Sequence, residues 1–174
     1  CGPKDLERLE RQSTRLAKLV TTMRSAVREG KRDDDRTIAV GPVMNEVRDL
    51  LLNRCQPASI SLEIKCENPD LSIEWNPVFM TQLLVNLASN AADAVEPLAE
   101  RWVRLEATAL GSGTIRITCT DSGSGIPAPV AENLFRPLFT TKTNGRGTGL
   151  GLSFCKMLVA NRGGTICYDL TSQN

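Results

Sequence analysis

The spacing of apolar residues divides the chain into a helical N-terminal segment and a longer segment in which helices and strands alternate. Between residues 5 and 29, apolar residues recur at alternating steps of three and four, the heptad pattern of a helix that packs against other helices. The members of this seam are Leu6, Leu9, Leu16, Val20, Met23 and Val27, with Ser13 as the one polar member. Gly30 and the charged run after it break the pattern. We therefore expect a coiled-coil-like helix and linker over 1–36 and a separate domain over 37–174. A helix folded back onto that domain is the alternative.

The pattern after residue 36 predicts a mixed α/β domain. Helices are expected over 42–53, 77–95, 129–134 and 149–161, and strands over 37–40, 59–66, 71–75, 102–110, 114–120 and 165–170. Asn76 before Pro77 is typical of a helix start, and Gly111 and Gly113 between two strands indicate a β-hairpin. Because strands outnumber the helical crossovers, we expect a two-layer α/β sandwich, with helices on one face of a mixed sheet.

Composition excludes several classes of function. Hydrophobic residues make up 41% of the 174 residues, charged residues 24% and aromatic residues 4%, and the net charge is +1. So balanced a charge and so few aromatic residues argue against nucleic-acid binding and against a polybasic membrane surface. No apolar run is long enough to span a bilayer. The charge is uneven, because 1–36 holds 10 basic and 7 acidic residues, net +3, and the remainder 11 and 13, net −2.

Two residue types constrain the chemistry further. Histidine is absent, which excludes Ser-His-Asp and Cys-His catalysis, imidazole metal sites and a phosphohistidine on this chain. The six cysteines form no C-x-x-C pair, so a zinc site is not expected. They are Cys1, Cys55, Cys66, Cys119, Cys155 and Cys167. We interpret them as reduced, mostly buried thiols of a cytoplasmic protein, with an extracellular disulfide scaffold as the poorer alternative.

A polar stripe follows the helix expected over 77–95. Asn86, Asn90 and Asp93 are spaced at i, i+4 and i+7, beside an apolar stripe on the same helix. Asparagine is a mediocre helix former, so two in register need a reason. A solvated face is one interpretation. The other is a cleft, in which an amide oxygen ligates Mg²⁺ beside phosphate oxygens.

Three loop motifs come after this helix. Asp121–Pro127 follows a strand directly, where a carboxylate can accept from an adenine amino group and glycines let a flat ring approach the backbone; a plain turn is the alternative. Leu134–Asn144 combines two phenylalanines with Lys142, as a phosphate-binding flap would, or as a pinned surface loop would. Gly145–Leu152 leads into a helix and is suited to hold phosphate, although it fits neither the dinucleotide fingerprint nor the P-loop.

Taken in this order, the motifs resemble those of the ATP-binding catalytic domain of bacterial sensor histidine kinases. The superfamily of this domain also includes gyrase B-type topoisomerases, MutL-type repair ATPases and the large heat-shock chaperones. The residues of the motifs are most similar to those of nitrogen-regulation-type kinases. Asn86–Ala94 resembles the N box, Asp121–Pro127 the G1 box, Leu134–Lys142 the F box and Gly145–Leu152 the G2 box. The resemblance covers about residues 38–170.

The resemblance implies ATP and Mg²⁺ as ligands and assigns roles to individual residues. It implies that Asn90 ligates Mg²⁺ and that Asp121 binds the adenine amino group in a pocket lined by Gly123, Gly125 and Ile126. Lys142 is expected to contact phosphate from a lid over 136–148. Backbone N–H groups for the phosphates are expected from Gly147, Thr148, Gly149, Leu150 and Gly151. Asp93 joins the nucleotide-binding set, and Asn86, Asn90 and Lys142 form the catalytic set.

Asn86 separates two branches of the superfamily. The hydrolytic members place a water-activating glutamate there, whereas an amide cannot serve as a general base. The resemblance therefore implies transfer of the γ-phosphoryl group to a histidine on a helix outside this chain. It also implies a response regulator receiver domain as partner, a homodimer through the N-terminal helix, the cytoplasmic part of a sensor, and a last strand beyond Asn174. The alternatives are a nucleotide-binding pseudokinase and, less favoured, a gyrase- or chaperone-type ATPase.

Overall fold

The computed structural model describes residues 35–111, 113–142 and 147–169, and these divide into two compact units between residues 125 and 126. The helix expected over 5–29 lies outside the described residues, so it and the domain boundary near residue 36 stay predictions. None of the described helices is both long and apolar enough to cross a membrane.

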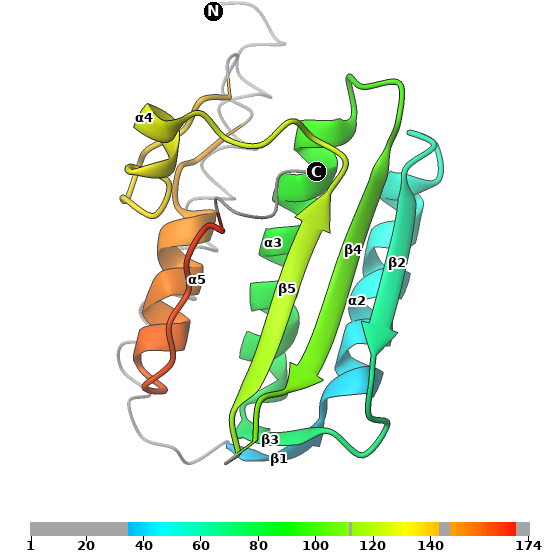
Figure 1. Cartoon of the computed structure of the whole chain (residues 1–174), viewed down its shortest axis with the longest axis vertical. Coiled ribbons are helices and arrows are strands. Elements are labelled where there is room, and N and C mark those ends of the chain that lie inside the picture. Colours follow the sequence, from blue (N-terminus) through cyan, green and yellow to red (C-terminus); the bar gives the residue numbers. More distant parts are fainter. Residues whose placement is uncertain (1–34, 112, 143–146, 170–174) are drawn as a thin grey trace, which may run out of the picture. The chain divides into compact units, whose positions relative to one another are not determined.

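The first unit contains two helices and five strands. Its elements are, in order, β1 (Arg36–Ala39), α2 (Val40–Cys55), β2 (Ser61–Cys66), β3 (Ser72–Trp75), α3 (Pro77–Val95), β4 (Trp102–Ala109) and β5 (Ile115–Asp121). The main sheet has the order β2-β4-β5, and β1 pairs with β3 in a separate two-stranded sheet. The main sheet is mixed, because β2 and β4 run parallel whereas β4 and β5 run antiparallel (Figure 1).

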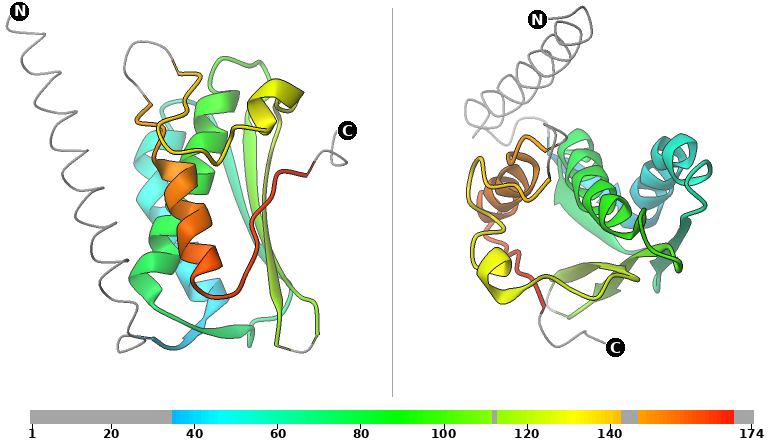
Figure 2. Two further views of the ribbon diagram at one scale, coloured as in Figure 1. Left: turned by 90° about the vertical axis from the view of Figure 1, so that its left-hand side faces the viewer. Right: turned by 90° about the horizontal axis from the view of Figure 1, so that it is seen from above.

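Helices α2 and α3 lie side by side over one face of the main sheet (Figure 2). Alternate residues of the central strand, Val103, Leu105 and Ala107, are fully buried under this helical layer. On α3 the buried positions recur at helical spacing, as an amphipathic helix requires. They include Met80, Leu84, Ala88, Ala91 and Val95. The mixed sheet with helices on one face is therefore confirmed.

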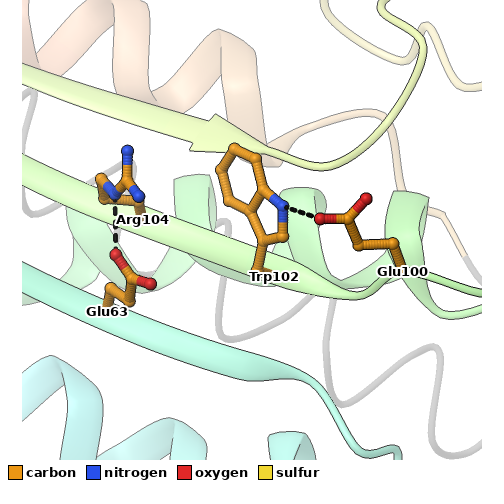
Figure 3. A network of polar contacts seen from close by, with 4 residues as sticks. All are labelled: Glu63, Glu100, Trp102 and Arg104. Atoms are coloured by element: carbon orange, nitrogen blue, oxygen red, sulfur yellow. Dashed lines mark hydrogen bonds and ion pairs between the residues drawn. The ribbon is translucent and has the colours of Figure 1, made fainter.

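The opposite face of the main sheet carries polar side chains (Figure 3). Arg104 of β4 donates to the carboxylate of Glu63, its register partner on β2, at 2.8 Å. Its guanidinium lies 5.3 Å from the ring centroid of Trp102, and the Trp102 indole donates to Glu100 at 3.0 Å. The Arg104 bond lowers the pKa of the Glu63 carboxyl.

Local sequence signals explain where the elements of the first unit begin and turn. The Asn76 side chain accepts hydrogen bonds from the backbone N–H groups of Val78, at 2.9 Å, and Phe79, at 3.4 Å, so the predicted start of α3 is confirmed. The hairpin between β4 and β5 is confirmed too. Gly111 and Gly113 there have φ values of +82° and +75°, which side chains with a Cβ rarely adopt.

The second unit contains α4 (Ala128–Ala131) and α5 (Gly151–Ala160). Helix α5 starts two residues later than expected, because Gly149 has a φ of +65°, which a right-handed helix does not allow. The strand expected over 165–170 is wrong for its described part. Residues 165–169 alternate between half-buried and exposed, but they form no ladder with another strand. Alternation alone predicts an extended chain, and a partner strand is needed to make it a strand.

Candidate functional site

Gln82 and Asn86 form one part of a polar edge on α3, beside its buried face. The side-chain amide of Gln82 donates to Oδ1 of Asn86, one turn further along, at 3.4 Å. The amide nitrogen Nδ2 of Asn86 is buried, and it makes no hydrogen bond to any of the described residues. Asn90 follows one turn later and is half-buried. The two asparagines thus occupy the positions that the spacing predicted, and Asn86 presents a buried donor.

Asp93 lies further along this edge and is engaged by the neighbouring helix. Its carboxylate forms an ion pair with the guanidinium of Arg54, near the end of α2, and both side chains are about one-third exposed. The pair ties α2 to α3. Neither Arg54 nor Gln82 was predicted from the sequence. Gln82 could have been found from its position four residues before Asn86, whereas nothing in the local pattern points to Arg54.

The loop after β5 holds Asp121 by a local turn. Oδ1 of Asp121 accepts from the backbone N–H of Gly123 at 2.8 Å. A Cβ at Gly123 would lie 2.7 Å from that oxygen, so glycine is needed for the turn as it stands. Position 125 also favours glycine, because Gly125 has a φ of +87°, which residues with a Cβ rarely adopt. Ser122 holds the loop in place, because its hydroxyl accepts from the backbone N–H of Trp102 at 3.1 Å and donates to the backbone carbonyl of Glu100 at 2.8 Å.

The topology of the first unit brings its two candidate groups to one end. Helix α3 and strand β5 both run in the direction opposite to β4, so the C-terminal part of α3 and the end of β5 lie at the same end of the unit (Figure 1). The part of α3 that carries Asn90 and Asp93 therefore lies at the same end as Asp121, the last residue of β5.

The second unit begins at Ile126, whose backbone N–H donates to the hydroxyl of Tyr168 at 2.8 Å. Tyr168 is the only tyrosine in the chain, and no sequence motif connects it with the glycine loop. This bond ties the start of the unit to a residue 42 positions later.

The glycines before α5 lie against residues 138–140, which belong to the segment with two phenylalanines and Lys142. A Cβ at Gly149 would lie 2.3 Å from the carbonyl carbon of Leu138, and the Leu138 N–H donates to the Gly149 carbonyl at 2.9 Å. A Cβ at Gly147 would lie 2.2 Å from the hydroxyl of Thr140. The two segments predicted to act on phosphate are thus in backbone contact.

Other features of this unit bear on phosphate binding. Within the described part of the chain, no side chain caps the N-cap residue of α5, and the first turn of the helix holds no acidic residue. The Leu150 N–H donates to the Thr148 hydroxyl at 3.4 Å, and the N–H groups that follow at the positive end of the helix are open to other acceptors. Thr148 and Leu150 precede α5, and Gly151 is its first residue. Lys142 is half-buried, and Phe135 lies with its ring centroid 6.0 Å from the Lys156 ammonium. Residues 143–146, including part of the expected lid and of the G2 motif, lie outside the described residues.

The predicted site residues therefore divide between the units. The first holds Asn86, Asn90, Asp93, Asp121, Gly123 and Gly125, and the second holds Ile126, Lys142, Gly147, Thr148, Gly149, Leu150 and Gly151. Among the described residues, no cluster of three or more histidine, cysteine, aspartate or glutamate side chains could hold a metal by itself. The amide oxygen of Asn90 fits a Mg²⁺ ion that is bound largely through phosphate oxygens and water.

The comparison with protein families decides the identity of this fold. A family model described as histidine kinase-, DNA gyrase B-, and HSP90-like ATPase matches residues 75–174. The chain belongs to this ATPase family. The matched range contains the predicted asparagine stripe and all three loop motifs.

Individual relatives place the ATPase domain among two-component sensor histidine kinases. It is 38% identical to the two-component sensor PprA of Pseudomonas aeruginosa over 112 residues, which are 61% of this chain and 12% of that protein. It is 30% identical to the sensor histidine kinase ZraS of Salmonella typhimurium over 163 residues, 94% of this chain and 32% of that protein. The chain thus spans about a third or less of the length of these curated relatives.

Solved structures agree with this placement. The catalytic domain of histidine kinase ThkA matches with a TM-score of 0.65 and 29% identity, covering 73% of this chain and 80% of that one. Full-length ShkA in complex with AMPPNP matches with a TM-score of 0.66 and 25% identity, covering 74% of this chain and 26% of that one. The ATPase domain is therefore of the histidine kinase catalytic type.

Proposed function

We propose that the chain binds Mg-ATP and transfers the γ-phosphoryl group to a histidine on a helix outside these 174 residues. The observation that carries this proposal is Asn86, an amide where the hydrolytic members of the superfamily carry a glutamate. With no general base at that position, bound ATP is held until a side-chain nucleophile reaches it.

Adenine recognition rests on the loop after β5. The Gly123 N–H fixes one oxygen of the Asp121 carboxylate, which gives that group a defined direction for accepting a hydrogen bond from an adenine amino group. Gly125 has the positive φ that allows a close backbone approach. Ile126 lines the same pocket in this proposal.

Phosphate binding rests on the second unit. The backbone N–H groups over 147–151 precede or begin α5, where the helix dipole favours negative charge. No side chain of the described residues caps this helix end, which supports its use by a ligand. Lys142 supplies a cation from the neighbouring segment and joins Asn86 and Asn90 in the catalytic set.

Asn90 would hold Mg²⁺ through its amide oxygen, beside phosphate oxygens and water. Mg²⁺, when bound, neutralises charge on the phosphates. Asp93 belongs to the same edge of α3, and its ion pair with Arg54 holds α3 against α2. We propose that Asp93 supports the nucleotide site mainly by this positioning. The protein's part in the transfer is then alignment of donor and acceptor.

The test supplies the missing helix. Purified chain is mixed with the acceptor-histidine helix of the full-length protein and γ-labelled ATP, and acid-labile label on that helix is expected. Asn90→Ala should abolish the label, whereas Asn53→Ala, an exposed position on α2, should leave it unchanged. Binding without any transfer would favour a pseudokinase, and rapid turnover of ATP by the chain alone would favour an ATPase.

Three further proposals concern the whole protein. We infer a response regulator receiver domain as partner, a homodimer through the helix expected over 5–29, and a cytoplasmic location. PprA, the relative named as a two-component sensor, supports the response regulator as partner. The free thiols among the described residues support the cytoplasmic location. The heptad seam supports the second, and a monomer in analytical ultracentrifugation at high concentration would contradict it.

A further inference from the structure

We propose that Gln82 is a positioning residue, which holds the Asn86 amide with its N–H donors turned toward the phosphates of the bound nucleotide. This inference rests on the proposed function and adds a residue to it. Gln82 lies one turn before Asn86 on α3, and residues at i and i+4 are neighbours on a helix surface. Its amide donates to Oδ1 of Asn86 at 3.4 Å.

The orientation of Asn86 follows from what an amide can do. A primary amide has one oxygen that accepts and one nitrogen that donates, on opposite sides of the same carbon. Once Gln82 takes the oxygen, Nδ2 must point the other way. Nδ2 is buried, and within the described part of the chain it meets no acceptor. A buried donor without an acceptor destabilises the protein, so the arrangement suits a ligand that brings one.

Phosphate oxygens are acceptors, whereas Mg²⁺ needs an oxygen ligand. An N–H donor at Asn86 therefore suits phosphate and cannot ligate the metal, so the two asparagines of the stripe take different tasks: Asn90 offers oxygen and Asn86 offers nitrogen. The opposite orientation of Asn86 would present its oxygen, which could accept from a water molecule. By preventing that orientation, Gln82 keeps Asn86 from offering an acceptor to the O–H group of a water molecule, which is what the glutamate of the hydrolytic branch offers.

The test is a double-mutant cycle on the 174-residue chain, with calorimetry of Mg-AMPPNP binding as the readout. Gln82→Met keeps the length of the side chain and removes its polar atoms. It should weaken binding about two- to tenfold, the usual range for one hydrogen bond. The matched control is Gln56→Met at the exposed end of α2, which should bind as the wild type does.

The cycle separates positioning from general structure. Since Gln82 acts only through Asn86, Gln82→Met should have no further effect in an Asn86→Ala background. Addition of Mg-AMPPNP should also protect the Asn86 side-chain NH₂ signal from hydrogen exchange in the wild type and much less in Gln82→Met.

Two results would overturn the inference. One is equal affinity of the wild type and Gln82→Met for Mg-AMPPNP. The other is a Gln82→Met effect that is as large in the Asn86→Ala background as in the wild type. Either would leave the proposed function standing. Absence of Mg-AMPPNP binding by the wild type would remove both.

Discussion

At the scale of single residues, Asp121 combines a structural and a proposed recognition role in one carboxylate. Its Oδ1 accepts from the Gly123 N–H, an interaction that an asparagine oxygen can also make. Asp121→Asn therefore keeps the turn while it removes the negative charge. This separates adenine recognition from loop folding.

We expect Asp121→Asn to weaken Mg-ADP binding about tenfold to a hundredfold, because a hydrogen bond to a charged group contributes roughly 1.5–3 kcal/mol. Calorimetry measures the change. Asp49→Asn, on the exposed side of α2, serves as the control and should bind as the wild type does. Unchanged affinity in Asp121→Asn would remove Asp121 from the site.

Cys119 makes the unfolding free energy depend on alkaline pH. Burial, with the negative charge of Asp121 adding to it, raises the pKa of the Cys119 thiol to about 12. An unfolded thiol ionises near pH 8.5, so above that pH the unfolded state loses a proton that the folded state keeps. The stability is therefore fully present below about pH 8.5 and falls as pH rises toward about 12, by at most roughly 1.4 kcal/mol per pH unit.

Urea unfolding at pH 8 and pH 10 measures this effect. Cys119→Val should lose less stability between the two pH values than the wild type, whereas Cys167→Ser, which removes an exposed thiol, should follow the wild type. Identical pH slopes in Cys119→Val and wild type would show that this thiol is not the group responsible.

At the scale of elements, the start of α3 depends on one side chain. Asn76→Ala removes the acceptor for two backbone N–H groups and should lower the free energy of unfolding by about 1 kcal/mol. Asn53→Ala, on the exposed side of α2, removes an asparagine without a capping role and should be neutral or slightly stabilising, since alanine is the better helix former. Denaturant titration compares the two variants, and equal effects would argue against the cap.

The start of α5 depends on close contact between two backbones. Gly149 and Gly163 have similar φ values, +65° and +71°, but only Gly149 has backbone atoms where a Cβ would go. Gly163→Ala should cost about 1–2 kcal/mol for the left-handed conformation alone. Gly149→Ala should cost more, because Leu138 must also move, and it should weaken Mg-ADP binding where Gly163→Ala does not. Similar unfolding midpoints for the two variants would contradict the contact.

At the scale of the whole molecule, the residues predicted to bind the nucleotide belong to both compact units. Binding of Mg-ADP should therefore slow hydrogen exchange in the first unit, over 86–95 and 121–125, and in the second, over 147–153. Mass spectrometry with and without Mg-ADP measures both regions at once. Protection confined to a single unit would show that the nucleotide contacts only that unit.

Local signals in the sequence predicted the start of α3 and the hairpin correctly, because each signal acts between residues that are close in the chain. The start of α3 rests on Asn76 and Pro77, which act within one turn, and the hairpin rests on glycines that act within four residues. The order of strands, with β4 between β2 and β5, was not predicted, since pairing depends on contacts far apart in the chain. The strand expected over 165–170 was wrong for residues 165–169 for the same reason, because the periodicity was present but no described strand pairs with them.

In the candidate site, too, local sequence predicts some features and tertiary contacts decide others. Residue types and spacing made Asn86, Asn90, Asp121 and the glycines before α5 candidates, because each motif is short and its residues are neighbours in the sequence. Only the tertiary structure decided that Asp93 pairs with Arg54, that Tyr168 takes the Ile126 N–H, and that Gly149 lies against Leu138. Those contacts join segments 11 to 42 residues apart, and the distance between such segments is set by packing of the whole unit, which no local pattern encodes.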